Sequence, residues 1–360
     1  MPERYRARDL GVAPGRFAPG PLNAITDVAG LRVGHVTLRE GERIRTGATA
    51  ILPHGGNLYQ EKVPAGFAVL NGFGKFAGST QVVELGELET PIVLTNTLAV
   101  GRAIEAVNRW TLAQPGNEQV ASINAVVGET NDSRLNDIRA GHPSVEQILQ
   151  AIAAAKTGPV EEGAVGAGAG TVAFGFKGGI GTSSRILPAK QGGFTLGVLV
   201  QSNYGGALRI DGRAFAEIQV SPGHTPAADT DGSIVMIIAT DAPLSDRNLR
   251  RLAERAFAGL ARTGSALSNG SGDYALAFST ADSVRRTAAR RAGVSPIEDL
   301  PNDKVSPLFE AVIEASEEAI LNSLFMAETT TGWDTVRGRA SKIEALPLEK
   351  LQKRRSGDQA

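Results

Sequence analysis

The sequence predicts a layered α+β fold, and three observations support that prediction. Apolar runs typical of strands recur along the 360 residues, mixed with helical segments but without the strict alternation of a Rossmann or barrel chain. Glycine is frequent, with 43 residues, and aromatic residues make up only 5%, which favours close-packed sheets and tight loops over a helical bundle. With 42% hydrophobic residues, a chain of this length can bury one large core or two smaller ones.

Six segments have the composition of buried strands. These are residues 50–52, 91–95, 123–127, 194–200, 233–240 and 274–279. Helical periodicity between them predicts four helices. Ser144 and Ser245 are suitable N-caps for two of these helices. A third begins near Ser306, with Pro307 at its first position, and a fourth covers residues 99–110.

Composition excludes several classes of protein and of site. The formal net charge of −1 gives no electrostatic basis for binding nucleic acid or a membrane surface. No apolar run approaches the ~20 residues of a membrane span, and residues 1–22 lack the apolar core of a signal peptide, so we expect a soluble, cytoplasmic protein. The chain has no cysteine, and its four scattered histidines form no zinc spacing, so we expect no metal and no cofactor.

The glycine-rich segment 163–181 invites a nucleotide-binding interpretation, but its spacing does not support one. Gly166, Gly168 and Gly170 do not match the dinucleotide fingerprint. Lys177 is followed by glycine, where a phosphate-binding loop has Ser or Thr. We therefore expect this segment to provide close backbone packing around a site.

The stretch Asp231-Gly232-Ser233, followed at once by the apolar run 234–239, is typical of a self-cleaving N-terminal nucleophile. The Ser233 hydroxyl can attack the Gly232 carbonyl, which turns the peptide bond into an ester that water then hydrolyses. The new chain would begin at Ser233, whose α-amine, with a pKa of ~7.7–8.0, could act as base for its own hydroxyl. The preceding segment 221–231 has the composition of an accessible loop. Gly-Ser is also a common turn dipeptide, so a turn remains the alternative.

Ser271 and Asp273 form a second group of chemically active side chains. They stand at the start of the predicted strand 274–279, and residues two apart in an extended chain face the same side, with about 7 Å between Cα atoms. A serine and a carboxylate so placed can relay protons to a nearby nucleophile. A hairpin-type turn is the alternative interpretation.

Two further polar residues follow predicted strands. Glu129 comes after the strand 123–127 and could bind a substrate ammonium. Asn203 comes after the strand 194–200 and could donate an amide N–H to an oxyanion. Either could instead be an ordinary capping residue.

Longer motifs carry a resemblance to a known family over residues 25–331. They are Asp-Val-Ala-Gly-Leu-Arg-Val-Gly-His at 27–35, Leu-Asn-Gly at 70–72, Thr-Asn-Thr at 95–97, the stretch 177–185, and Ala-Thr-Asp-Ala-Pro-Leu at 239–244. The chain resembles the DmpA-like self-processing peptidases (the P1 family), which include the L-aminopeptidase/D-amidase/D-esterase and the β-aminopeptidases.

The resemblance implies the chemistry of the candidate residues. Ser233 is similar to the family nucleophile, which is released by cleavage after Gly232. Ser271 and Asp273 match its serine–acid relay, in which better-known members carry glutamate. Asn203 looks like the amide that stabilises the oxyanion.

The resemblance also implies how a substrate binds. Glu129 looks like the carboxylate that holds the substrate amine. Asn131 stands where the β-aminopeptidases carry a tyrosine that contributes to the oxyanion site, and a smaller polar side chain there would change substrate preference. The implied function is a serine aminopeptidase that removes N-terminal residues from short peptides, amides or esters through an acyl-enzyme on Ser233.

The family fold implied by the resemblance is a single four-layer αββα domain over residues 1–360, similar to the ornithine acetyltransferases and analogous to N-terminal nucleophile hydrolases. Cleavage would give an α-chain of residues 1–232 and a β-chain of residues 233–360, folded as one unit. Such pairs would assemble into a homo-oligomer.

Two alternatives remain open. One is acyl transfer like that of the ornithine acetyltransferases, which cleave before threonine, so that Ser233 argues modestly against it. The other is an uncleaved, non-catalytic binding protein on the same fold.

Overall fold

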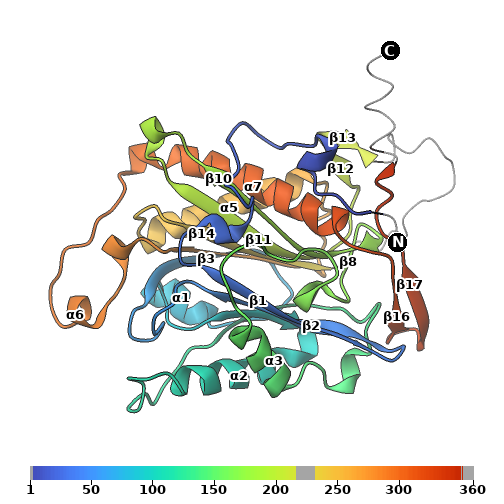
Figure 1. Ribbon diagram of the computed structural model, residues 1–360, viewed down its shortest axis with the longest axis horizontal. Helices are drawn as coiled ribbons and strands as arrows, with labels where there is room; N and C mark the ends of the chain where they lie inside the picture. The colour runs from blue at the N-terminus through green and yellow to red at the C-terminus, as the bar shows by residue number, and fades with distance from the viewer. Residues whose placement is uncertain (1–2, 216–231, 350, 352–360) are drawn as a thin grey trace.

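Two β-sheets packed face to face form the centre of the protein, and helices cover the outer face of each sheet (Figure 1). The structure, a computed structural model, describes residues 3–215, 232–349 and 351. The predicted α+β fold with four αββα layers is confirmed. Asp231 and the segment 221–231, expected to form an accessible loop, lie outside the described residues.

The first sheet has six strands in the order β10-β11-β14-β15-β3-β5. Their bounds are β10 (Gly179–Ile186), β11 (Thr195–Asn203), β14 (Ser233–Thr240), β15 (Gly272–Ser279), β3 (Val63–Gly72) and β5 (Glu87–Leu88). Neighbouring strands are antiparallel except for β14 and β15, which run parallel. Because these two strands are parallel, their first residues lie side by side at the same end of the sheet.

The second sheet has five strands in the order β1-β2-β6-β7-β4. Their bounds are β1 (Arg32–Glu40), β2 (Ile44–Leu52), β6 (Ile92–Asn96), β7 (Val126–Thr130) and β4 (Phe76–Ala77). Three small hairpins complete the described β-structure: β8 (Val172–Ala173) with β9 (Phe176–Lys177), β12 (Arg209–Ile210) with β13 (Arg213–Ala214), and β16 (Thr330–Asp334) with β17 (Arg339–Ile343).

The helices lie on the two outer faces. Helices α5 (Asp246–Arg262) and α7 (Ser306–Phe325) cover the six-stranded sheet, and α2 (Val100–Leu112) and α3 (Val145–Ala153) cover the five-stranded sheet (Figure 1). The shorter helices are α1 (Ser79–Leu85) and α6 (Ala288–Arg291). The capping prediction for α3 is confirmed, because Ser144 Oγ accepts from Gln147 N at 3.2 Å. Ser245 stands at the N-cap of α5, but its side chain makes no capping hydrogen bond.

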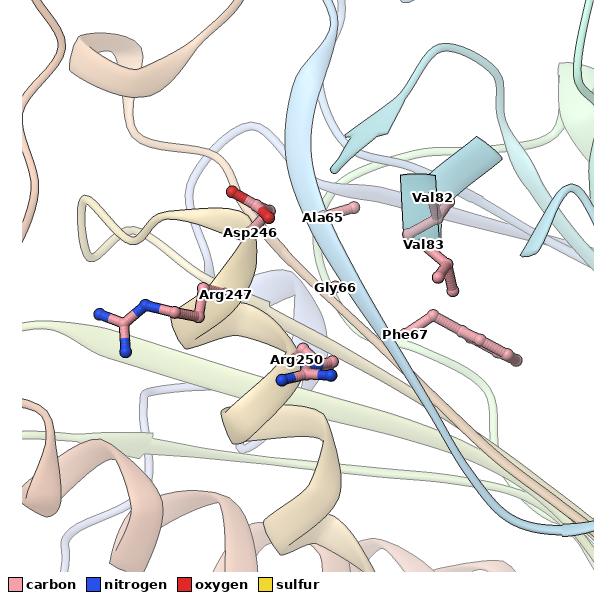
Figure 2. Close-up of a pocket in the computed structure, with 8 residues that line it drawn as sticks. All are labelled: Ala65, Gly66, Phe67, Val82, Val83, Asp246, Arg247 and Arg250. Carbon is pink, nitrogen blue, oxygen red and sulfur yellow. The ribbon is translucent and has the colours of Figure 1, made fainter. Parts of the chain in front are cut away.

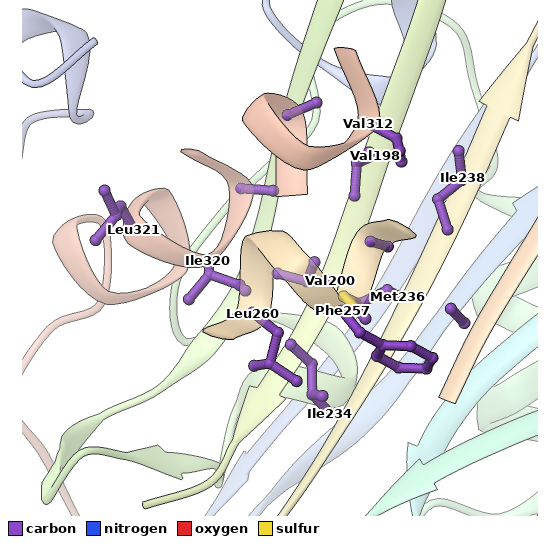
Figure 3. Packing of buried hydrophobic residues seen from close by; sticks show 14 of the residues in the cluster. Val198, Val200, Ile234, Met236, Ile238, Phe257, Leu260, Val312, Ile320 and Leu321 are labelled. Atoms are coloured by element: carbon purple, nitrogen blue, oxygen red, sulfur yellow. The ribbon is translucent and has the colours of Figure 1, made fainter. Parts of the chain in front are cut away.

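Strand β14 is apolar between its terminal residues Ser233 and Thr240 because it is buried on both faces. Ile234, Met236 and Ile238 point toward α5 and α7, where Figure 3 shows them packed among residues of those helices and of β11. Val235 and Ile237 point the other way, into the layer between the two sheets. The uninterrupted run 234–239 is therefore a consequence of the position of β14 in the middle of the sandwich.

Three predicted strands differ from the observed ones in a way that matters for the site. β7 is shifted toward the C-terminus and contains Glu129, β11 continues through Asn203, and β15 begins early enough to contain Asp273. These polar residues are therefore inside strands rather than beyond their ends. Ladder pairing explains the extension, since Glu129 pairs with Thr95, and Asn203 pairs with Ser233.

Gly181 in β10 lets α7 pack directly on the six-stranded sheet. A Cβ atom on this residue would lie 2.0 Å from the carbonyl oxygen of Ala319 and 2.5 Å from the nitrogen of Ser323. We expect Gly181→Ala to lower the free energy of unfolding by about 1–3 kcal/mol, because overpacking forces backbone shifts. Urea unfolding checks this, with Gly101→Ala in α2 as control, since a Cβ there meets nothing within 4 Å. Equal stability of the two variants would contradict the prediction.

Candidate active site

Strand register brings Ser233 next to two other candidate groups. Ser233, the first residue of β14, pairs with Asn203 of β11 on one side and with Gly272 of β15 on the other. Gly272 lies between Ser271 and Asp273 in the sequence. Asn203, Ser233 and the Ser271/Asp273 pair thus lie at the same end of the six-stranded sheet. They come from three separate segments of the chain.

Ser233 is largely buried, with 8% of its surface exposed, and its Oγ accepts a hydrogen bond from Gly272 N at 3.1 Å. The residue before it has no room for a side chain. A Cβ on Gly232 would lie 2.1 Å from the carbonyl oxygen of Asn203 and 2.5 Å from the Cα of Tyr204. Only glycine therefore fits the peptide that leads into β14.

Ser271 and Asp273 face the same side of β15, as the two-residue spacing predicts. Ser271 Oγ donates to Asp273 Oδ1 at 2.5 Å. The carboxyl is fully buried, and its Oδ2 has no hydrogen-bond partner within the described parts of the chain. Burial raises the pKa of Asp273, while the hydrogen bond from Ser271 lowers it.

The register also shows which face of the sheet this pair occupies. Asp273 pairs with Ile234, which points toward α5 and α7, whereas Ser233 is one residue out of phase and points into the layer between the sheets. Ser271 and Asp273 therefore do not lie beside the Ser233 hydroxyl. They lie on the face of the sheet that α5 and α7 cover.

Both ends of the Asn203 side-chain amide are held by backbone groups. Its Oδ1 accepts from Val172 N at 2.9 Å, and its Nδ2 donates to the carbonyl of Asn131 at 3.0 Å. An amide NH2 has two hydrogens, so one N–H remains to bind an oxyanion. The Asn131 side chain is exposed, and its Oδ1 accepts from Ser133 N at 3.0 Å.

Glu129 is buried at the end of β7, with 2% of its surface exposed. Its carboxylate accepts hydrogen bonds from Lys75 N at 2.9 Å and from the Thr97 hydroxyl. The ammonium of Lys75 lies 3.9 Å from Glu129 Oε1, although its own side chain is more than half exposed. A buried carboxylate facing a cavity is suited to bind an amine.

A cavity of about 300 Å³ joins these groups. Its lining residues are Phe73, Gly74, Lys75, Thr97, Glu129, Asn131, Ser133, Arg134, Val172, Gly175, Asn203, Tyr204, Gly232, Ser233, Gly270 and Val336. Five of the seven predicted site residues are in this set, and Ser271 and Asp273 are not. None of the three histidines within the described residues, His35, His54 and His142, lines the cavity.

Sequence reasoning missed several of the lining residues. Thr97 belongs to the Thr-Asn-Thr motif, which could have indicated its contact with Glu129. Phe73 and Val336 form an exposed apolar rim, and Val336 comes from the turn between β16 and β17, about 200 residues from Glu129 in sequence. No local pattern in the sequence indicates that this turn reaches the cavity.

A second hollow, of about 170 Å³, lies away from these residues. Figure 2 shows apolar side chains from β3 and α1 together with Asp246, Arg247 and Arg250 from α5. None of its lining residues carries a hydroxyl group. The cavity beside Ser233 is therefore the candidate active site. Within the described ranges, no group of three or more His, Asp or Glu residues is arranged to hold a metal ion.

Comparison with known proteins assigns the family. Residues 23–337 match the profile of Peptidase family S58. The chain belongs to this family. The beta-peptidyl aminopeptidase BapA of Sphingosinicella microcystinivorans is 44% identical to it, over 97% of this chain and 91% of the relative.

Two solved structures are similar over nearly the whole S58 chain. The PH0078 protein from Pyrococcus horikoshii OT3 is 48% identical, with a TM-score of 0.89 over 98% of this chain and 99% of that one. The L-aminopeptidase D-Ala-esterase/amidase from Ochrobactrum anthropi is 35% identical, with a TM-score of 0.87 over 99% of both chains. The latter structure is described as a prototype for the serine aminopeptidases and a variant of the Ntn hydrolase fold.

These comparisons confirm the resemblance, the fold class and the predicted function of a hydrolase, a serine aminopeptidase or amidase acting on peptide or amide substrates. The individual site residues, the acyl-enzyme and the self-cleavage stay predictions. In the described part of the chain, no helix has the length and apolar character needed to cross a membrane.

Proposed function

We propose that this S58 peptidase cuts itself between Gly232 and Ser233, giving chains of residues 1–232 and 233–360 that remain one αββα unit. The Ser233 hydroxyl adds to the Gly232 carbonyl carbon, and the C–N bond breaks as the amine takes the hydroxyl proton. Water then hydrolyses the resulting ester, which frees the Gly232 carboxylate and restores the hydroxyl. The observation that carries the proposal is the placement of Ser233 at the start of a buried central strand, beside the candidate cavity and after a residue that must be glycine.

In turnover, Ser233 Oγ attacks the substrate carbonyl while its own α-amine takes the hydroxyl proton. The remaining N–H of Asn203 stabilises the oxyanion. The proton passes to the leaving amine or alcohol as that bond breaks, and water hydrolyses the acyl-enzyme. No cofactor takes part in these steps.

Ser271 and Asp273 serve the new amine rather than the hydroxyl. Ser233 pairs with Gly272, which lies between Ser271 and Asp273, so the α-amine freed by cleavage forms at the same end of the sheet as this pair. The unpartnered Oδ2 of buried Asp273 supplies an acceptor for that amine. This placement supports a role in orienting the amine and exchanging protons with it.

The substrate class follows from Glu129. Its buried carboxylate faces a cavity of about 300 Å³, which suits a short peptide, amide or ester whose free N-terminal amine binds there. BapA is named as a beta-peptidyl aminopeptidase. We propose that acceptance of such substrates by this chain depends on Asn131, a small polar residue that lines the cavity.

Two exposed apolar side chains support the proposal that the processed pairs form a homo-oligomer, and we propose separately that this oligomer is cytoplasmic. Val83 and Leu85 of α1 are 66% and 61% exposed. Large apolar side chains grouped on one short helix are typical of an interaction surface. No nucleic-acid partner is proposed, given the net charge of −1.

Replacement of Glu129 tests the proposed function. We expect Glu129→Gln to lower kcat/KM for an amino-acid p-nitroanilide roughly 10- to 100-fold, because a hydrogen bond between charged groups is worth ~1.5–3 kcal/mol. Hydrolysis of the matching des-amino acyl p-nitroanilide should change little, since that compound has no ammonium to bind.

Glu105→Gln, an exposed substitution on α2, is the matched control and should leave both rates unchanged. Intact mass must first show that each variant is processed to the same extent. An equal loss on both substrates, or no loss on either, would argue against Glu129 as the amine-binding group.

A further inference from the structure

Lys177 is a buried cation that the proposed mechanism does not use. Its side chain has no exposed surface, and its Nζ donates to the backbone carbonyls of Gly168 at 2.7 Å, Thr171 at 2.9 Å and Gly178 at 2.8 Å. These bonds use all three hydrogens of the ammonium, and none of them goes to a side chain. Burial lowers the pKa of Lys177 to about 7, so keeping the charge there is costly.

One peptide group connects Lys177 to Asn203. The carbonyl of Thr171, which accepts from Lys177, belongs to the same peptide unit as the N–H of Val172. That N–H donates to Asn203 Oδ1 at 2.9 Å. Because the peptide unit is planar and stiff, fixing its carbonyl also fixes the direction of its N–H. A cation on the carbonyl polarises the unit, which strengthens the N–H as a donor.

This hydrogen bond determines which way the Asn203 amide faces. A side-chain amide turned by about 180° fits nearly the same space, because its terminal torsion is roughly two-fold. In the turned orientation, Nδ2 would face the N–H of Val172, and two donors would meet. The oxygen must therefore lie toward Val172, which directs both hydrogens of Nδ2 to the other side, toward Asn131 O and the cavity.

A buried carboxyl group follows Asn131 in the sequence and interacts electrostatically with Lys177. Asp132 is buried, accepts from Asn136 Nδ2 at 3.0 Å, and packs against Gly170 in the segment that Lys177 holds. Burial raises the pKa of Asp132 to about 7, and the charge of Lys177 opposes that rise. The Val172 N–H, which donates to Asn203, shares a peptide unit with the carbonyl that Lys177 binds. The Asn131 carbonyl, which accepts from Asn203, shares a peptide unit with the N–H of Asp132.

We propose that Lys177 is a positioning residue for the aminopeptidase reaction, holding the Thr171–Val172 peptide so that the Asn203 amide presents its free N–H to the oxyanion. The inference rests on the proposed role of Asn203. It assigns a use to a buried charge that folding alone would favour replacing with an apolar side chain.

Lys177→Met tests the proposal, because it removes the charge and keeps the length of the side chain. Loss of an oxyanion donor costs roughly 10²–10³-fold in kcat, and we expect Lys177→Met to lose about tenfold or more. KM should change less than twofold, since Glu129 still binds the amine. Rates are expressed per processed chain, with the processed fraction measured by intact mass.

Lys62→Met is the matched control. Lys62 is also largely buried and pairs with Glu89 at 2.5 Å, but it precedes β3, whose other end reaches the site roughly 30 Å away. The Lys62→Met substitution removes a largely buried ammonium that does not contact the Thr171–Val172 peptide, so kcat should stay within twofold of wild type. A fall in kcat equal to that of Lys177→Met would overturn the proposal.

A double-mutant cycle shows whether Lys177 acts through Asn203. If it does, Lys177→Met added to Asn203→Ala should cause no further loss in kcat, whereas independent effects multiply. Full activity of Asn203→Ala alone would reject the proposed oxyanion role. If Asn203→Ala alone strongly lowers kcat, and the losses of the two single variants multiply in the double variant, only the inference about Lys177 is rejected.

Lys177→Gln extends the test if the methionine variant is unstable. It keeps N–H donors without the charge, and we expect a kcat between those of wild type and Lys177→Met, with KM unchanged. If neither Lys177 variant folds while Lys62→Met does, the residue is required for folding and the positioning proposal is wrong. Circular dichroism and the melting temperature decide that question.

Discussion

The Ser233→Ala variant is expected to remain a single chain of 37.5 kDa and to have no hydrolase activity. The alanine has no oxygen to attack the Gly232 carbonyl, so no ester forms and the peptide bond persists. The same change removes the group that would carry the acyl intermediate. Intact mass spectrometry of the purified protein, followed by an assay with an amino-acid p-nitroanilide, measures both effects.

Ser279→Ala is the control for this variant. Ser279 is buried at the opposite end of β15, where its hydroxyl donates to the carbonyl of Ala242 at 2.6 Å. This variant should be cut and active like the wild type, although less stable. Two fragments from Ser233→Ala, or hydrolysis above background, would show that another residue is the nucleophile.

Replacing Arg185 in β10 is expected to cause a large loss in the free energy of unfolding. Its guanidinium is completely buried between two acidic residues of α7, with distances of 3.1 Å to Glu314 and 2.8 Å to Glu318. It also donates to the carbonyls of Pro14 and Ser184. We expect Arg185→Met to lower the free energy of unfolding by about 3–5 kcal/mol, because it removes the buried cation that compensates both carboxylates, although Glu318 keeps its ion pair with Arg8.

Urea unfolding followed by circular dichroism measures this loss. Glu314→Gln on the Arg185→Met background should recover part of it, since it removes one of the uncompensated charges. Arg16→Met is the control, because its ion pair with Glu310 is exposed and such pairs contribute ~0–1 kcal/mol. A loss at Arg185 no larger than that at Arg16 would contradict the prediction.

The fold was predictable from sequence where burial alone shapes the pattern. The run 234–239 reads as a strand because both faces of β14 are covered by apolar layers. In contrast, β10 was missed because it contains Thr, Ser and Arg side chains that are buried and satisfied by distant groups. Thr182 Oγ1 donates to Val198 O, and Ser183 Oγ donates to Ala315 O. No local sequence pattern reveals such partners.

The sequence indicates individual candidate residues, five of which line the cavity, but it does not indicate how they are arranged. The two-residue spacing correctly places Ser271 and Asp273 on one side of a strand. That this side is opposite to the Ser233 hydroxyl depends on the pairing of β14 with β15, which sequence does not specify. The contact between Lys177 and Thr171 likewise depends on how a glycine-rich segment folds back, and it could not be anticipated from composition.

The central position of β14 has a further consequence for a chain cut after Gly232. All eight residues of β14 pair with β11 on one side and β15 on the other, and these two strands belong to different halves of the cut chain. The halves thus remain interlocked without a covalent link, yet once separated they must find each other by diffusion. Folding of the uncut chain is a first-order process, whereas assembly of two separated halves is second-order. Cutting after folding avoids the second-order step. A processed sample that has been denatured would recover with a yield that depends on protein concentration.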